Sequence, residues 1–124
     1  MATVKDLITG EPFSVEPSTT VAEAATMMAE RRIGSALVME GEKLLGIFTE
    51  RDVLRAMGEQ FDAAQHPVSE WMTHDPIVID PGADAKSALE TMLERNFRHL
   101  PVVDGGAVLG VVSMRDLTAA EAAD

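Results

Sequence analysis

Apolar residues recur at helical spacing in two stretches of the chain. The first stretch contains Val21, Ala24, Ala25 and Met28, and the second contains Ala85, Ala88, Leu89 and Met92. Residues at these spacings share one face of a helix. Thr20 precedes the first stretch and is followed three residues later by Glu23, which is the pattern of a capping box, and Asp84 precedes the second. The pattern therefore predicts two amphipathic helices, each beginning after a capping residue.

A β-rich run follows each predicted helix. The runs are "SALVM" at 35–39 and "HLPVV" at 99–103, and after short turns containing Gly41 or 104–106 come "KLLGIF" at 43–48 and "AVLGVV" at 107–112. Two apolar runs separated by a glycine-containing turn are typical of a β-hairpin. A further helix is predicted from Thr49 to about Met57, and its counterpart runs from Ser113 towards the C-terminus.

The order of elements occurs twice because the sequence contains an internal repeat. A shift of 64 positions aligns Val4–Gln60 with Val68–Asp124 without a gap, and 15 of the 57 aligned pairs are identical. Average residue frequencies would give about four or five identities in such a window. A repeat of roughly 60 residues buries little surface alone, so we expect the two repeats to share one core across a pseudo-twofold axis. The expected division is residues 1–60, a linker at 61–67, and residues 68–124.

Composition narrows the class of protein. The chain has 124 residues, 46% hydrophobic and 25% charged, and no apolar run approaches the roughly 18 residues of a membrane span. The first ten residues lack the long apolar centre of a secretion signal, so we expect a cytoplasmic protein without a membrane partner. A net charge of −11 disfavours nucleic acid as a partner, and the absence of cysteine excludes thiolate chemistry.

Each repeat closes on one short motif. "GIFTERD" occupies 46–52 and "GVVSMRD" occupies 110–116. In each, a hydroxyl residue precedes an aspartate by three positions, Thr49 before Asp52 and Ser113 before Asp116. One interpretation is a capped helix start. The other is a ligand site, because a carboxylate one turn into a helix can accept two hydrogen bonds from a vicinal diol. The two roles are compatible.

Together with "VKDLITGEPFSV" and "VSEWMTHDPIVI", which open the repeats, the closing motif resembles the CBS (cystathionine β-synthase domain) family. The resemblance covers nearly the whole chain and implies an α/β (α+β) fold of two tandem βαββα units, a Bateman module. It also implies two pseudo-symmetric clefts that bind AMP, ADP or ATP, and in some members S-adenosylmethionine or a dinucleotide. Such modules generally regulate an effector without catalysis, and they commonly form homodimers through their helices. Any effector is expected to be a separate protein.

The resemblance assigns ribose binding to Asp52 and Asp116, with Thr49 and Ser113 beside them. Adenine is expected to lie against the strands near Ile33–Leu37 and Phe97–Pro101. The favoured site comprises Thr49, Asp52, Arg98, His99, Leu100 and Pro101, and the second, weaker site comprises Ile33, Gly34, Ser35, Ala36, Ser113 and Asp116. Arg98 and His99 correspond to the uncharged Gly34 and Ser35, and a guanidinium fork suits a phosphate. Thr9, Thr73, Arg51 and Arg115 are additional candidates, although the two arginines also fit solvated ion pairs.

Alternative functions come from other classes. The chain could be a structural dimerisation module with empty clefts, or a sensor of S-adenosylmethionine or a dinucleotide. No catalytic triad, phosphate-binding loop or dinucleotide motif is present, so an enzyme is not expected. His66 and His74 lack the spacing of metal ligands, and no metal is expected beyond Mg²⁺ carried by a nucleotide. Trp71 is expected to pack at a junction between repeats or between subunits.

Overall fold

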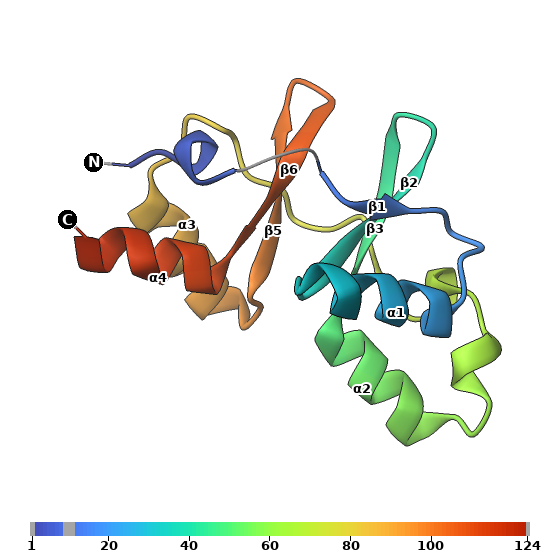
Figure 1. Ribbon diagram of the computed structural model, residues 1–124. Coiled ribbons are helices and arrows are strands. Elements are labelled where there is room, and N and C mark those ends of the chain that lie inside the picture. Colours follow the sequence, from blue (N-terminus) through green and yellow to red (C-terminus); the bar gives the residue numbers. More distant parts are fainter. Residues whose placement is uncertain (1, 9–11, 124) are drawn as a thin grey trace. The chain divides into compact units, whose positions relative to one another are not determined.

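The computed structural model describes residues 2–8 and 12–123, with residue 123 described for its backbone only (Figure 1). Its helices are η1 (Val4–Leu7), α1 (Val21–Arg31), α2 (Glu50–Glu59), η2 (Ala63–Gln65), η3 (Val68–Glu70), α3 (Ala85–Arg95) and α4 (Met114–Ala123), where η marks a 3₁₀ helix. Its strands are β1 (Ser14–Val15), β2 (Ser35–Glu40), β3 (Lys43–Thr49), β4 (Thr73–His74), β5 (His99–Asp104) and β6 (Ala107–Ser113). No helix within the described ranges combines the length and the apolar surface that a membrane span requires.

The chain folds into two compact units whose boundaries differ from those of the sequence repeats. One unit is Phe13–Pro76, and the other joins Met1–Pro12 to Ile77–Asp124; we call them the first-hairpin unit and the second-hairpin unit. The opening segment of each repeat therefore packs with the helices and hairpin of the other repeat.

Equivalent hydrogen bonds attach the two opening segments. The amide of Val4 donates to the carbonyl of Ala83 at 2.8 Å, and the amide of Val68 donates to the carbonyl of Thr19 at 2.8 Å. The two donors, Val4 and Val68, are 64 positions apart in the sequence, and so are the two acceptors, Thr19 and Ala83. The sequence repeat is therefore accompanied by a repeated hydrogen bond. Val4 and Val68 are both fully buried, which fixes η1 and η3 against their units.

The first-hairpin unit contains a four-stranded sheet in the order β1-β2-β3-β4. Strand β1 runs parallel to β2, and the β2–β3 and β3–β4 pairs are antiparallel. The core of this unit contains Ala36, Val38 and Phe48 from the hairpin, Val21, Ala24 and Met28 from α1, and Ala56 from α2. The periodic face predicted for the first helix is thus the face that covers the sheet.

The second-hairpin unit repeats this arrangement around β5 and β6, which pair antiparallel. Its core contains Val4, Ala85, Ala88, Met92, Leu100, Val102, Val112 and Leu117. Ile79 forms a parallel bridge to Val102, in the place that β1 takes in the first-hairpin unit. Both hairpins and all four α-helices expected from the sequence are confirmed.

Side-chain hydrogen bonds cap the N-termini of α1 and α3. Thr20 Oγ1 accepts from the amide of Glu23 at 3.1 Å, and Glu23 Oε1 accepts from the amide of Thr20 at 2.9 Å. Asp84 Oδ1 accepts from the amide of Ser87 at 2.7 Å. These bonds hold the pKa of both acids, Glu23 and Asp84, below their usual values. The capping residues predicted for α1 and α3 are therefore confirmed.

Glycines in β3 and β6 permit the opening segments to approach the hairpins. A Cβ atom on Gly46 would lie 2.5 Å from the carbonyl oxygen of Thr73 and 2.7 Å from Sδ of Met72. A Cβ atom on Gly110 would lie 2.8 Å from Cγ2 of Ile8. All three distances are shorter than an ordinary packing contact. The glycine that begins each closing motif therefore makes room for the segment that opens the other repeat.

Candidate functional site

The first closing motif forms a capping box at the junction of β3 and α2. Asp52 Oδ2 accepts from the amide of Thr49 at 2.9 Å and from its hydroxyl at 3.1 Å. The amide of Asp52 in turn donates to Thr49 Oγ1 at 3.3 Å. Asp52 is only 7% exposed, so these bonds fix a largely buried carboxylate at a helix N-terminus. The capping role expected of Thr49 and Asp52 is confirmed.

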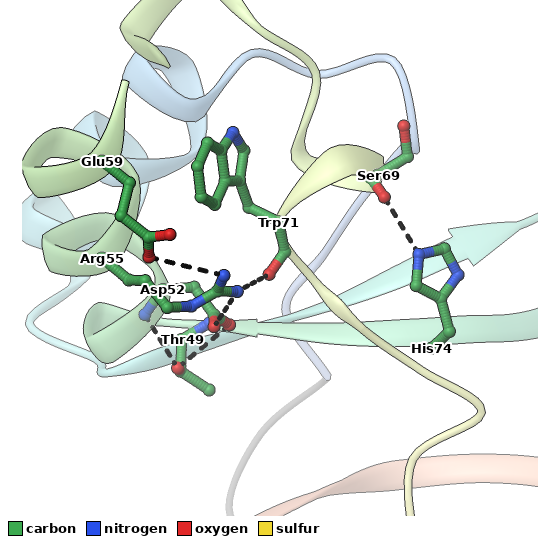
Figure 2. A network of polar contacts seen from close by, with 7 residues as sticks. All are labelled: Thr49, Asp52, Arg55, Glu59, Ser69, Trp71 and His74. Carbon is green, nitrogen blue, oxygen red and sulfur yellow. Dashed lines mark hydrogen bonds and ion pairs between the residues drawn. The ribbon is translucent and has the colours of Figure 1, made fainter. Parts of the chain in front are cut away.

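A second set of contacts reaches the other oxygen of Asp52, as Figure 2 shows. Arg55 Nη2 donates to Asp52 Oδ1 at 3.3 Å and to the carbonyl oxygen of Trp71 at 2.8 Å. The guanidinium carbon lies 5.1 Å from the centre of the Trp71 ring, and Arg55 Nη1 lies 3.9 Å from Glu59 Oε2. Arg55 thus joins the capping box of α2 to the segment that opens the second repeat.

Trp71 lies in the core of the first-hairpin unit and is 8% exposed. Its Nε1 atom is buried and, in the part of the chain that the structure describes, has no acceptor. The contact between Arg55 and Trp71 is not predicted by any pattern in the sequence that was used above. The available signal was an arginine one helical turn after Asp52, at a spacing that favours an ion pair.

The second closing motif has a different environment. The amide of Asp116 donates to Ser113 Oγ at 3.1 Å, so a hydroxyl caps α4 as expected. Asp116 is exposed, whereas Asp52 is buried. Position 119 corresponds to Arg55 and holds alanine, and position 7 corresponds to Trp71 and holds leucine. The contacts of Arg55 are therefore a property of the first-hairpin unit.

The residues at the start of each hairpin lie beside the closing motif of the same unit. The Gly34 carbonyl accepts from the amide of Glu50 at 3.0 Å, and Ser35 pairs with Thr49 across the β2–β3 ladder. In the second-hairpin unit the Arg98 carbonyl accepts from the amide of Met114 at 2.7 Å, and His99 pairs with Ser113. The structure thus brings Ser35 to Thr49 and His99 to Ser113. The expected sharing of one site by Asp52, Arg98 and His99 stays a prediction.

The remaining candidates divide by exposure. Ser35, Ala36, Leu100 and Pro101 are buried, Ser113 and His99 are half-buried, and Ile33, Arg51, Thr73, Arg98 and Arg115 are exposed. Thr73 lies in β4 opposite Ile47. Thr9 lies outside the described residues. Arg51 and Arg115 occupy the first turns of α2 and α4.

His66 and His74 make separate contacts. His66 Nδ1 lies 2.6 Å from Glu70 Oε2, and its Nε2 lies 3.2 Å from Asp62 Oδ1. Hydrogen bonds to Glu70 and then to Asp62 raise the pKa of His66. His74 Nε2 lies 3.1 Å from the Ser69 carbonyl, also drawn in Figure 2. Within residues 2–8 and 12–123 no group of three histidine or acidic side chains is arranged to hold a metal ion.

Known proteins share the sequence repeat and the fold of this chain. The profile of the CBS domain family matches residues 4–59 and 68–123. The CBS domain-containing protein YhcV of Bacillus subtilis is 33% identical over 117 residues, which cover 94% of this chain and 84% of YhcV. Both matches span the two repeats.

Solved structures give the same result. The CBS-domain containing protein ATU1752 from Agrobacterium tumefaciens superposes with a TM-score of 0.92 and 31% identity, over 97% of this chain and 99% of that one. The CBS domain protein PAE2072 from Pyrobaculum aerophilum, solved in complex with AMP, superposes with a TM-score of 0.85 and 27% identity, over 99% and 100% of the two chains. The chain therefore belongs to the CBS domain family and contains a tandem pair of CBS domains.

Proposed function

We propose that this CBS domain pair is a regulatory module that binds an adenine nucleotide, AMP, ADP or ATP, and signals its presence to a separate effector protein. The observation that carries the proposal is the Asp52 carboxylate, which is 7% exposed and oriented by Thr49 at the start of α2. PAE2072, which shares the fold and the paired organisation, is complexed with AMP.

The chemistry of the closing motif suits a nucleoside. A ribose presents two neighbouring hydroxyl groups, and a carboxylate can accept a hydrogen bond from each. The N-terminus of a helix also favours the phosphate groups through its free amides and its dipole. Asp52 and Asp116 each occupy the first turn of a helix of ten residues, so each repeat supplies one carboxylate at a helix N-terminus.

We assign the stronger site to Asp52 and Thr49 together with Arg98 and His99 of the second repeat. The Arg98 guanidinium and the His99 imidazole give this site donors for phosphate, whereas Gly34 and Ser35 give the other site neither group. No group of residues in the sequence matches a catalytic motif, and we propose binding without turnover of the nucleotide.

Calorimetric titration with AMP of Asp52→Ala and Asp116→Ala variants tests this assignment. An arginine–phosphate contact contributes roughly 1.5 to 3 kcal/mol, so the Asp52 site is expected to bind AMP about tenfold or more tightly than the Asp116 site. Asp52→Ala is therefore expected to cause the larger loss of AMP binding. An equal loss in both variants would contradict the unequal sites. Wild-type protein that shows no heat with AMP, ADP, ATP or S-adenosylmethionine would contradict ligand sensing altogether and favour a structural module.

We also propose that the module forms a homodimer through helix α2. Leu54 and Met57 on this helix are 75% and 48% exposed, and Phe61 just beyond it is fully exposed. The spacing of Leu54 and Met57 places both on one face of α2. Exposed apolar side chains gathered in one place mark an interaction surface more often than isolated ones do.

A further inference from the structure

Asp52 has almost no acceptor capacity left for a ribose. A carboxylate oxygen has two lone pairs, so the group offers about four acceptor positions. Oδ2 already accepts two hydrogen bonds, both from Thr49, and Oδ1 accepts one from Arg55. Counting the described residues, one position on Oδ1 remains. A diol has two hydroxyl donors, so one existing donor must leave before both hydroxyls can bind.

Arg55 is the donor that leaves at the smallest cost. Its bond to Asp52 is 3.3 Å long and its side chain is 46% exposed, so solvent weakens this ion pair. Arg55 also keeps other partners, the Trp71 carbonyl at 2.8 Å and Glu59 at 3.9 Å. The backbone amide of Thr49 cannot turn away, and Thr49 Oγ1 is held beside Asp52 because it also accepts from the amide of Asp52.

We propose that Arg55 is a specificity-determining residue that occupies Oδ1 of Asp52 and is displaced when a vicinal diol binds there. This inference rests on the proposed function of Asp52. A ligand with a single hydroxyl uses the remaining position on Oδ1 and leaves Arg55 in place. Arg55 thus reduces the preference of the Asp52 site for a full ribose over a deoxyribose.

Displacement of Arg55 also changes the surroundings of Trp71. The same nitrogen, Nη2, donates to Asp52 and to the Trp71 carbonyl, and the guanidinium lies over the indole ring. Trp71 is the single tryptophan of the chain. Its fluorescence therefore reports on Arg55 without any label.

The binding experiment compares AMP with 2′-deoxy-AMP by calorimetry in an Asp116→Ala background, so that the heat comes from the Asp52 site. Arg55→Ala is expected to bind AMP about two- to fivefold more tightly, the range of an exposed ion pair, and to bind 2′-deoxy-AMP unchanged. Arg55→Met keeps an alkyl chain over Trp71 and should behave in the same way. In the matched control, Arg55→Ala in an Asp52→Ala background should leave AMP binding unchanged. Weaker AMP binding, or an equal change for both nucleotides, would overturn the proposal.

A second measurement needs no ligand and separates this inference from the proposed function. Asp52→Asn should shift the emission of Trp71 when Arg55 is present and leave it unchanged in an Arg55→Ala protein. Additive shifts would show that Arg55 does not connect the two residues and would overturn the inference. If the shifts are not additive but wild-type protein binds neither nucleotide, the contact stands, while the proposed function and the displacement step both fail.

Discussion

His66 Nδ1 lies 2.6 Å from Glu70 Oε2, and on the other side of the ring Nε2 lies 3.2 Å from Asp62 Oδ1. His66 Nε2 also lies 3.2 Å from the side-chain nitrogen of Gln60. In its protonated form the imidazole can donate to both carboxylates, Glu70 through Nδ1 and Asp62 through Nε2. These bonds raise the pKa of His66 above its usual value of about 6.5. His66 also accepts, through its carbonyl, from the amide of Val21 at 2.9 Å, so its position is coupled to the start of α1.

We predict that His66 makes stability depend on pH near neutrality. A histidine with a raised pKa in the folded state stabilises the protein fully below the pKa of the unfolded chain, and this contribution is lost as pH rises through the folded pKa. The urea midpoint of wild type should therefore exceed that of His66→Gln by more at about pH 6 than at about pH 8.5.

The Glu70→Gln variant is the matched control for His66, because it keeps the histidine and removes the first cause of its raised pKa. It should flatten the same part of the pH profile. A difference between wild type and His66→Gln that is equal at both pH values would exclude this role of His66.

We predict that alanine at the two motif glycines destabilises the protein to different extents. Gly46→Ala should cost about 1–3 kcal/mol, as overpacking does, because the clashing atom includes a backbone carbonyl oxygen at 2.5 Å. Gly110→Ala should lower the free energy of unfolding by less, because the nearest atom belongs to the side chain of Ile8, which can move. Unfolding in urea with circular dichroism measures both.

Gly58 in α2 provides a control, because alanine at this position is expected to stabilise the protein. Nothing lies within 4 Å of a Cβ atom at this position, and the residue is helical. Gly58→Ala should therefore stabilise by about 0.5–1 kcal/mol through helix propensity. Similar stability changes at positions 46 and 58 would show that the close approach of Met72 and Thr73 to β3 is unimportant.

The features that sequence predicted well are local ones. Thr20 with Glu23 and Thr49 with Asp52 are three residues apart, and a capping box needs no information from elsewhere in the chain. The hairpins were likewise visible because a glycine turn joins adjacent apolar runs. The same locality explains why the helix starts could be placed to within one residue.

The features that sequence missed depend on distant segments. The amide of Val4 donates to Ala83, and Arg55 reaches Trp71 across 16 positions, so neither contact follows from local patterns. The alignment of the repeats did contain a signal. Gly46 and Gly110 are identical at equivalent positions inside strands, and a glycine within a strand often marks the close approach of another segment. The difference between Arg55 and Ala119 was equally visible, but its meaning required the position of Trp71.

We predict that charge at Leu54 on α2 and at Phe61 just beyond it separates the proposed homodimer. Leu54→Glu combined with Phe61→Glu should give a monomer by sedimentation velocity at concentrations where wild type is a dimer. Each substitution occurs twice in a twofold interface, which enlarges the effect. The monomer should keep its stability to urea, because Leu54 is 75% exposed and Phe61 fully exposed.

Ala22→Glu on α1 is the control for added charge, since position 22 is exposed and lies on a different helix. It should leave the dimer intact. The positions that correspond to Leu54 and Met57 in the second repeat are Thr118 and Glu121, both polar, so α4 does not repeat this apolar pair. A wild-type protein that sediments as a monomer at every concentration, or a double variant that stays dimeric, would show that α2 does not form the interface.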